Sequence, residues 1–532
     1  MKRLILFVAI MALSAPSFAQ EQADLELMNS LSCTSIMVGK GASADGSVIT
    51  SHTCDSWYRT WMEMTPAADH TVGEMEAIYD GRMHTQSASD STKLYVKGYI
   101  PQVAHTYRFL DTAYPSMNEK QLAMGETTYT GRAEMINKNG MFMIEELQRV
   151  ALERCTTARE AIRLMGDLAS KYGYGDSGEC LTVADPNEVW IFEIQGEGPD
   201  KLGAVWAAVR IPDDEIGVSA NVSRIGRLDL ADKDHYMASS NVKEVAKKMG
   251  FWDGKGEFSF WKAYSGTNYM KEVKNYSVRD LFIMQQLAPS AGFTDEMEEL
   301  PVSVKPDNKV TLQQVFDLLS SYYEGTDLDM SGRLQVPDDK SKESGATKVS
   351  PKANPWMRGD EMAIYKALGD TAMKSVRVVS EPWCAYSTVI QLRSWLPDEV
   401  GGVAWISFDN PGQSPRIPVF AGCTRLPEQM RVCGQHSVRD ESAIWQFRKA
   451  NRLSTVLWGT FRTNIEESRA HFFGKGLREM PFVESTFKSL QTVDPQAAVR
   501  FLNDYTFDYY SAAAAKWKEM ERYFWQQTWK GF

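Results

Sequence analysis

The sequence has few cysteines for its length and lacks the short motifs of several large enzyme classes. Seven cysteines in 532 residues are too few for a disulfide scaffold, and an odd number in an exported protein leaves at least one thiol unpaired. There is no GxxxxGK(S/T) loop, HExxH motif or CxxC pair. Positive charge is also scarce, with a formal net charge of −11. This balance argues against nucleic acid or an anionic membrane as the main partner.

Long apolar runs are absent except at the start of the chain. Met1-Lys2-Arg3 precedes an apolar run over residues 4–13, and Ser17-Phe18-Ala19 places small residues where a signal peptidase reads them. This order predicts a signal peptide over residues 1–19, because about ten apolar residues are too few to span a bilayer. No integral membrane segment is predicted later in the chain. We therefore expect an exported protein, located in the periplasm or outside a bacterium.

A hairpin is expected directly after a short polar stretch. Residues 20–32 carry no strong structural signal, whereas residues 33–39 and 48–52 are rich in β-branched and apolar side chains that favour strands. The Asp45-Gly46 step between them is typical of a tight turn. Asp55 follows the second strand. Pairing of the two strands would bring its carboxylate back toward residue 33.

Cys33 is the candidate nucleophile of this hairpin. If residues 20–32 are a propeptide, their removal gives Cys33 both a thiol and a free α-amine, whose pKa in model peptides is about 7.7–8.0. Such an amine can take the thiol proton and later protonate the leaving amine, as in hydrolases with an N-terminal threonine. The alternative is an ordinary buried strand cysteine.

Several blocks of sequence resemble the cysteine dipeptidases of peptidase family C69. The first block is Cys33-Thr34 followed by the Gly/Ala/Ser-rich turn and Asp55-Ser56. Later blocks follow in the same order as in the family, and the resemblance runs from Cys33 to near the C-terminus. They lie at residues 172–174, 188–193, 206–214, 219–221, 393–397, 401–405 and 415–422.

The resemblance implies an α+β fold of the N-terminal nucleophile hydrolases, a superfamily that also holds choloylglycine hydrolases and penicillin V acylases. We expect a four-layer αββα sandwich over residues 33–440, with a polar loop at 338–353, and a helical C-terminal extension over 441–532 packed on it. The implied roles are Asp55 holding the amino terminus of the nucleophile and Asn221 donating its amide to the oxyanion, a donor typically worth about 3–4 kcal/mol. No cofactor is implied.

His52 is a departure from the family pattern, which usually has arginine three residues before the aspartate. Histidine titrates near pH 6.5, where arginine does not. If His52 takes the place of the arginine, activity should shift between roughly pH 5.5 and 7.5. Arg224 and Arg227 are candidates for supplying the missing charge. A metal site of His52, Cys54 and Asp55 is a minor alternative, because no second ligand cluster has a recognisable spacing.

The sequence leaves the substrate open. The favoured function is hydrolysis of dipeptides through a thioester, so the expected partner is a small peptide substrate, and a homo-oligomer is compatible with the sequence. The same machinery could instead cleave N-acyl amides such as bile-salt or penicillin-like compounds. A non-catalytic binding protein that keeps the fold is the alternative of a different class, and the substituted His52 is compatible with it.

Elsewhere the patterns of the sequence alternate between helix and strand. Periodicity predicts helices over residues 145–165, 241–249 and 311–323, and strands over 205–211 and 403–408. Asp185 and Glu193 are expected to flank a solvated hairpin. From residue 441 onward helical patterns dominate and carry many aromatic side chains, which we expect to form core or subunit contacts.

Overall fold

Two antiparallel sheets form the centre of the molecule. The computed structural model describes residues 33–56, 58–265, 274–357, 360–367, 377–435 and 437–530. One sheet has seven strands in the order β16 (Ser303–Val304), β14 (Ile216–Ser219), β1 (Ser35–Val38), β2 (Val48–Cys54), β19 (Tyr386–Leu392), β20 (Val403–Phe408) and β21 (Ile417–Phe420). The other has eight, in the order β15 (Tyr236–Ala238), β13 (Ala204–Ile211), β12 (Val189–Gly196), β11 (Gly178–Ala184), β10 (Ala123–Thr130), β9 (Met117–Asn118), β8 (Phe109–Asp111) and β3 (Glu63–Thr65).

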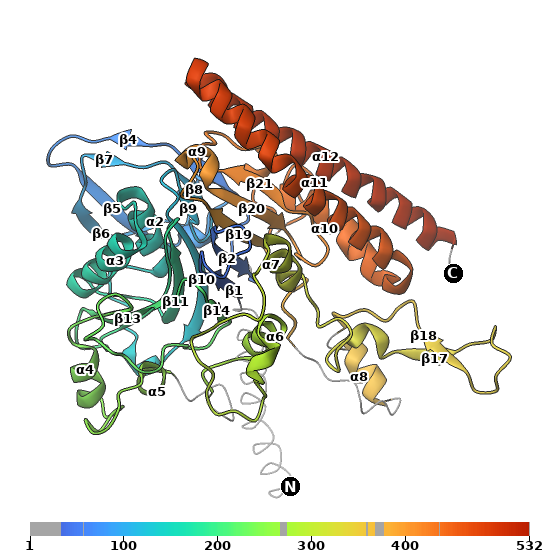
Figure 1. Cartoon of the computed structure of the whole chain (residues 1–532), viewed down its shortest axis with the longest axis horizontal. Coiled ribbons are helices and arrows are strands. Elements are labelled where there is room, and N and C mark those ends of the chain that lie inside the picture. The colour runs from blue at the N-terminus through green and yellow to red at the C-terminus, as the bar shows by residue number, and fades with distance from the viewer. Residues whose placement is uncertain are drawn as a thin grey trace, which may run out of the picture.

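Helices cover the outer faces of both sheets. On one side α3 (Ala158–Tyr172) contacts β11, β12 and β13, next to α2 (Ile144–Arg154). On the other side α10 (Ala443–Val456) contacts β20 and α12 (Pro495–Lys530) contacts β21, with α11 (Trp458–Val493) antiparallel to α12 (Figure 1). The chain is therefore a mixed α+β protein with long C-terminal helices.

The remaining elements are short. Three two-stranded sheets pair β4 (Ala68–Asp69) with β7 (His105–Thr106), β5 (Met75–Asp80) with β6 (Tyr95–Pro101), and β17 (Gln335–Pro337) with β18 (Thr347–Val349). The short helices are α4 (Val242–Lys248), α5 (Phe260–Tyr264), α6 (Val278–Leu287), α7 (Leu312–Leu319), α8 (Asp360–Ala367) and α9 (Asp398–Gly401). Within the described ranges, no helix has the length and apolar character needed to cross a membrane.

A glycine lets the two sheets approach closely beside β2. A Cβ atom on Gly125 of β10 would lie 2.3 Å from the backbone oxygen of Ser51 on β2, so only glycine fits there without a shift. The next residue, Glu126, thereby comes within reach of β2. Polar side chains also join the sheets nearby, since the hydroxyls of Thr50 and Thr182 lie 2.5 Å apart.

Most of the expected elements are present, with one difference in a helix. Strands over 205–211 and 403–408 match β13 and β20, and α4 and α7 lie within the expected helices at 241–249 and 311–323. The single helix expected over 145–165 is two helices, because Thr157 caps a new start: its hydroxyl accepts from Glu160 N and the Glu160 side chain accepts from Thr157 N. Within the expected loop at 338–353, residues 347–349 form β18.

The structure does not test the expected N-terminal segments or the expected domain boundary. The signal peptide (1–19) and propeptide (20–32) lie outside the described residues, and the domain boundary at residue 441 stays a prediction. All seven cysteines are described, and all are buried unpaired thiols.

Candidate active site

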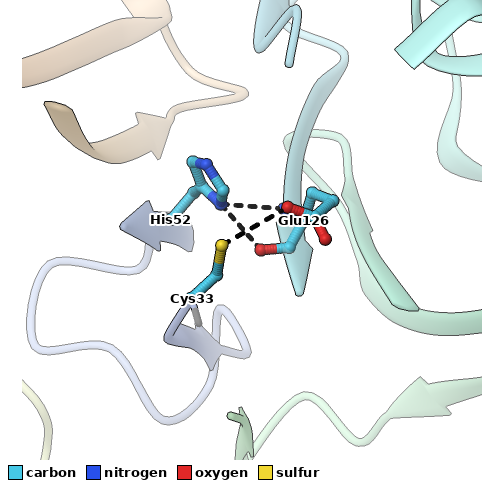
Figure 2. A group of neighbouring side chains, drawn as sticks. All are labelled: Cys33, His52 and Glu126. Carbon is cyan, nitrogen blue, oxygen red and sulfur yellow. Dashed lines mark hydrogen bonds between the residues drawn. The ribbon is translucent and has the colours of Figure 1, made fainter. Parts of the chain in front are cut away.

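Cys33 lies buried between the two sheets, two residues before β1. Only 3% of its surface is exposed. Its backbone N donates to Asn221 Oδ1 at 2.8 Å, and its Sγ lies 3.5 Å from Glu126 Oε2. Figure 2 shows that Cys33, His52 of β2 and Glu126 of β10 come together from three separate segments of the chain. Both the nitrogen and the sulfur of Cys33 therefore face polar groups.

Strand pairing explains why distant residues meet here. Thr34 N donates to Thr53 Oγ1 at 2.8 Å, and Thr53 N donates to Thr34 O at 3.0 Å, so the end of β2 returns beside Cys33 as the hairpin predicts. On the other side of β1, Ser35 is paired with Ser219, which places Asn221, two residues beyond Ser219, beside Cys33.

Asn221 is held in a backbone conformation that few residues adopt. Its φ is 63°, in the left-handed region where asparagine is among the more tolerated residues. Its Oδ1 accepts from Cys33 N, and its Nδ2 donates to Thr128 O at 2.7 Å. The side chain thus has a fixed orientation at the nucleophile. Its role as an oxyanion donor stays a prediction.

Arg279 is a site residue that the sequence did not reveal. It lies in the first turn of α6, and its Nη1 donates to Cys33 O at 2.6 Å and to Thr34 Oγ1 at 2.9 Å. Its Nη2 donates to Asn221 Oδ1 at 2.8 Å. Burial lowers the pKa of Arg279 to about 10, so the guanidinium stays charged at neutral pH. The capping box of Ser277 and Asp280 was the one sequence signal that a helix begins here.

Asp55 lies at the end of β2 and is paired with a second arginine. Its Oδ2 accepts from Arg377 Nη2 at 2.5 Å and from Thr53 Oγ1 at 2.9 Å. Arg377 also contacts Glu381 at 3.0 Å. The Oδ1 atom of Asp55 is buried and has no hydrogen-bond partner among the residues that the structure describes. One carboxylate oxygen thus remains available beside the start of β1.

His52 is buried and electrically neutral at pH 7. Its Nδ1 lies 2.7 Å from Glu126 O, and its ring packs against Tyr114 and Tyr386. Burial lowers the pKa of His52 to about 4, although the backbone of Glu126 and the charge of Asp55 oppose this shift. The ring therefore does not supply the fixed positive charge of an arginine, and the expected activity change between pH 5.5 and 7.5 does not follow from it. Arg279 and Arg377 supply positive charge instead.

The two other arginines considered from the sequence lie away from the nucleophile. Arg224 is fully buried, and its Nε donates to Val218 O at 3.1 Å. Arg227 is exposed and pairs with Glu257 at 2.8 Å.

Glu193, expected to be solvated, is instead buried and accepts from Arg224 N at 2.5 Å. Asp185 is also buried and accepts from Ala158 N at 2.9 Å. Glu193 and Asp185 thus organise the structure around the β11–β12 hairpin.

The surroundings of Cys33 favour the neutral thiol. Burial raises the pKa of the Cys33 thiol well above its ordinary value, and the charge of Glu126 raises it further, against a smaller opposing effect of the Asp55 backbone. Burial likewise raises the pKa of Glu126 to about 7. A thiolate does not form here without a nearby base that can accept its proton.

Three of these side chains carry atoms suited to a metal ion. The ligand atoms of Cys33, His52 and Glu126 lie within 4.8 Å of one another, and sulfur, imidazole nitrogen and carboxylate oxygen are all zinc ligands. This set differs from the minor alternative of His52, Cys54 and Asp55. Because it includes the candidate nucleophile, a metal bound here would block the thiol.

Comparison with known proteins identifies the family. The family model of "Peptidase family C69" matches residues 32–471. A "Probable dipeptidase" of Latilactobacillus sakei is 27% identical over 77% of this chain and 80% of its own length. A "Probable dipeptidase" of Salmonella dublin is 27% identical over 74% and 81%, and a "Probable dipeptidase B" of Streptococcus pyogenes serotype M1 is 24% identical over 88% of both chains. The chain belongs to peptidase family C69.

Proposed function

We propose that this protein is an exported dipeptidase of the N-terminal nucleophile type, in which Cys33 acts after removal of residues 1–32. The observation that carries the proposal is the setting of Cys33. Its backbone N is bonded to Asn221 Oδ1, while its Sγ lies in the same buried polar site. The two packed sheets with outer helices support the N-terminal nucleophile fold, and the relatives named as dipeptidases support the substrate class.

The free amine of Cys33 is the proposed base. The raised pKa of the thiol requires a base within reach, and an α-amine has a pKa near neutrality and lies next to its own sulfur. Asn221 Oδ1, which accepts from Cys33 N, and the buried Oδ1 of Asp55 would orient this amine once the Ser32–Cys33 bond is cut. Family precedent favours self-cleavage of that bond by the same thiol.

The reaction would follow two steps of acyl transfer. The amine takes the thiol proton as Sγ attacks the carbonyl carbon of the substrate, and the protonated amine then passes that proton to the leaving amine as the peptide bond breaks. A water molecule, deprotonated by the amine, attacks the thioester and releases the acid and the thiol. The developing oxyanion would be stabilised by Asn221, with the charge of Arg279 nearby. None of these steps needs a cofactor.

Maturation is the first experiment. N-terminal sequencing and intact mass of protein purified from its own host should give a chain that begins at Cys33. The Cys33→Ala variant should keep its propeptide if cleavage is autocatalytic, and it should lose hydrolysis in either case. A functional wild-type chain that retains a peptide bond before Cys33 would overturn the mechanism.

The substrate class is tested by comparing the rates at which the enzyme cleaves compounds of different classes. Mature wild-type protein is given dipeptides, an N-acyl amino acid, a conjugated bile salt and penicillin V in parallel. We expect the highest kcat/KM for the dipeptides. A higher value for an N-acyl amide would assign the same machinery to that class. A chain that starts at residue 20, resists alkylation at Cys33 and cleaves none of these compounds would be a binding protein.

A further inference from the structure

A pair of buried carboxyl groups lies beside the nucleophile and has no role in the mechanism above. Glu126 of β10 and Glu179 of β11 belong to neighbouring strands, in which Thr128 is paired directly with Glu179. Residues 126 and 128 share one face of β10, so Glu126 and Glu179 are diagonal neighbours on that face. Both are almost completely buried. The face that meets Cys33 is therefore acidic.

No positive side chain neutralises this pair. Among the described residues, neither Glu126 nor Glu179 forms a salt bridge with lysine, arginine or histidine. Glu126 Oε1 accepts from Thr128 Oγ1 at 3.1 Å, and a hydrogen bond joins the two carboxyl groups to each other. Beyond that shared hydrogen bond, Glu179 Oε1 accepts from Ser177 Oγ at 3.4 Å. Two buried carboxyl groups are costly unless something compensates them.

Protonation compensates the pair only in part. Burial and the charge of Glu126 raise the pKa of Glu179 well above its ordinary value, while that of Glu126 is raised to about 7. At neutral pH the pair therefore carries roughly one negative charge or less when the site is empty. A cation that enters the site would draw the proton out and gain a charge-assisted hydrogen bond.

The position of the pair relative to Cys33 fits one part of a dipeptide. In an unblocked dipeptide the α-ammonium nitrogen lies about 2.5 Å from the carbonyl carbon of the same residue. That carbon must come within about 3–3.5 Å of the attacking sulfur. Glu126 Oε2 lies 3.5 Å from Sγ, so a carboxylate oxygen is available where the ammonium group of such a substrate would be.

We propose that Glu126 and Glu179 form the site that binds the α-ammonium group of the substrate, and thereby restrict cleavage to the first peptide bond of an unblocked chain. The inference rests on the proposed dipeptidase function and adds a specificity element to it. A longer chain entering with its internal bonds, or a substrate with an acylated amine, would bring a neutral amide to this carboxyl pair and leave it without a cation.

The experiment compares two substrates that differ in one group. Alanyl-alanine and its des-amino analogue propionyl-alanine are given to mature wild-type enzyme and to Glu179→Gln and Glu126→Gln variants. Glu193→Gln is the matched control, because it also removes a buried carboxyl group whose pKa burial raises to about 7 but lies on β12. N-terminal sequencing confirms Cys33 as the first residue of each protein.

We expect Glu179→Gln to lower kcat/KM for alanyl-alanine by about tenfold to a hundredfold, mainly through KM, which is the fold-change of one charged hydrogen bond. The rate on propionyl-alanine should stay unchanged, as should the ratio of the two substrates in Glu193→Gln. Glu126→Gln should reduce the ratio in the same direction. An equal loss on both substrates would assign the pair to support of the thiol and overturn the proposal, as would a ratio that does not move.

If the variants do not fold, inhibitor binding to the wild-type enzyme tests whether the carboxyl pair binds an ammonium group. Non-hydrolysable isosteres of the two substrates are compared as competitive inhibitors, and the one with the ammonium group should bind at least about tenfold more tightly. Equal inhibition constants would overturn the inference while leaving dipeptide hydrolysis intact. A correctly processed wild type that cleaves no dipeptide would instead overturn the proposed function.

Discussion

Two buried parts of this molecule, the surroundings of Cys33 and those of Trp517, differ in how their side chains satisfy their polar atoms. Around Cys33, charged and polar groups are buried, and atoms such as His52 Nε2 and Arg279 Nε have no partner among the described residues. In the seam between the sheet and helices α10–α12, the aromatic ring of Trp517 is buried and its Nε1 donates to both Asn451 Oδ1 and Gln413 O. The side chains around Cys33 thus leave several polar atoms without a partner, whereas the single polar atom of the Trp517 side chain has two acceptors.

The contrast separates residues kept for chemistry from residues kept for stability. Unpartnered buried polar groups cost free energy, and proteins accept such costs at sites where a ligand completes the arrangement. Substitutions in the two regions should therefore change different quantities: those in the helical seam the free energy of unfolding, and those near Cys33 the catalytic rate.

The largest effect is expected for Trp517→Ala in the helical seam. Trp517 packs against Phe447 and Phe472, with ring centroids 5.7 and 6.0 Å away. Its removal should lower the free energy of unfolding by about 3–5 kcal/mol, as large aromatic-to-alanine changes in cores do. Denaturant unfolding measures this loss. The kcat of the fraction that remains folded should stay close to that of the wild type; a large fall in kcat would mean that the seam and the site are coupled.

Arg279→Ala should have the next largest effect, on the catalytic rate and not on the free energy of unfolding. The variant loses the donors to Cys33 O, Thr34 Oγ1 and Asn221 Oδ1. We expect kcat/KM to fall about a hundredfold to a thousandfold, in the range of a lost electrostatic contact at a reacting group. Steady-state kinetics on processed enzyme, corrected for the folded fraction, provide the measurement.

Arg279→Lys is the matched control for this substitution. It keeps the charge but loses the forked donor geometry, so its activity should lie between those of the wild type and the alanine variant. An alanine variant as active as the wild type would place Arg279 outside the machinery.

The pH dependence of the free energy of unfolding should reveal the lowered pKa of His52 in the folded protein. Its folded pKa of about 4 lies below its ordinary value of 6.5, so below pH 6.5 the unfolded chain binds a proton that the folded protein does not. His52 therefore contributes fully to the free energy of unfolding above pH 6.5. This contribution declines by roughly 3 kcal/mol as the pH falls to about 4.

Comparison with His52→Gln isolates this contribution from that of the buried carboxyl groups. Unfolding free energies are measured for both proteins at several values between pH 7 and pH 4. The difference between wild type and variant should change steadily below pH 6.5. A difference that is constant with pH would show that His52 has the same pKa in the folded and unfolded states, so that burial does not keep its ring neutral below pH 6.5.

The sequence predicts the local parts of this arrangement well. The hairpin that begins at Cys33, the strand before Asn221 and the C-terminal helices follow from patterns within a few residues of each other. Arg279 could not be predicted, because its contact with Cys33 depends on packing of α6 across 246 residues of sequence. The burial of His52 was missed for a similar reason: it results from the close approach of β10 at Gly125, which alternation within β2 does not reveal.

The smallest effect, and the one that delimits the helical seam, is expected for Trp529→Ala. Trp529 lies on the same helix as Trp517 but is 88% exposed, so the variant should change the free energy of unfolding by no more than about 0.5 kcal/mol. Denaturant unfolding of the two variants side by side tests whether burial, and not the mere presence of tryptophan, stabilises α12. A loss at Trp529 comparable to that at Trp517 would mean that this end of α12 is covered in solution by another surface, and the comparison would then have to be repeated at several protein concentrations, since such a contact between copies weakens on dilution.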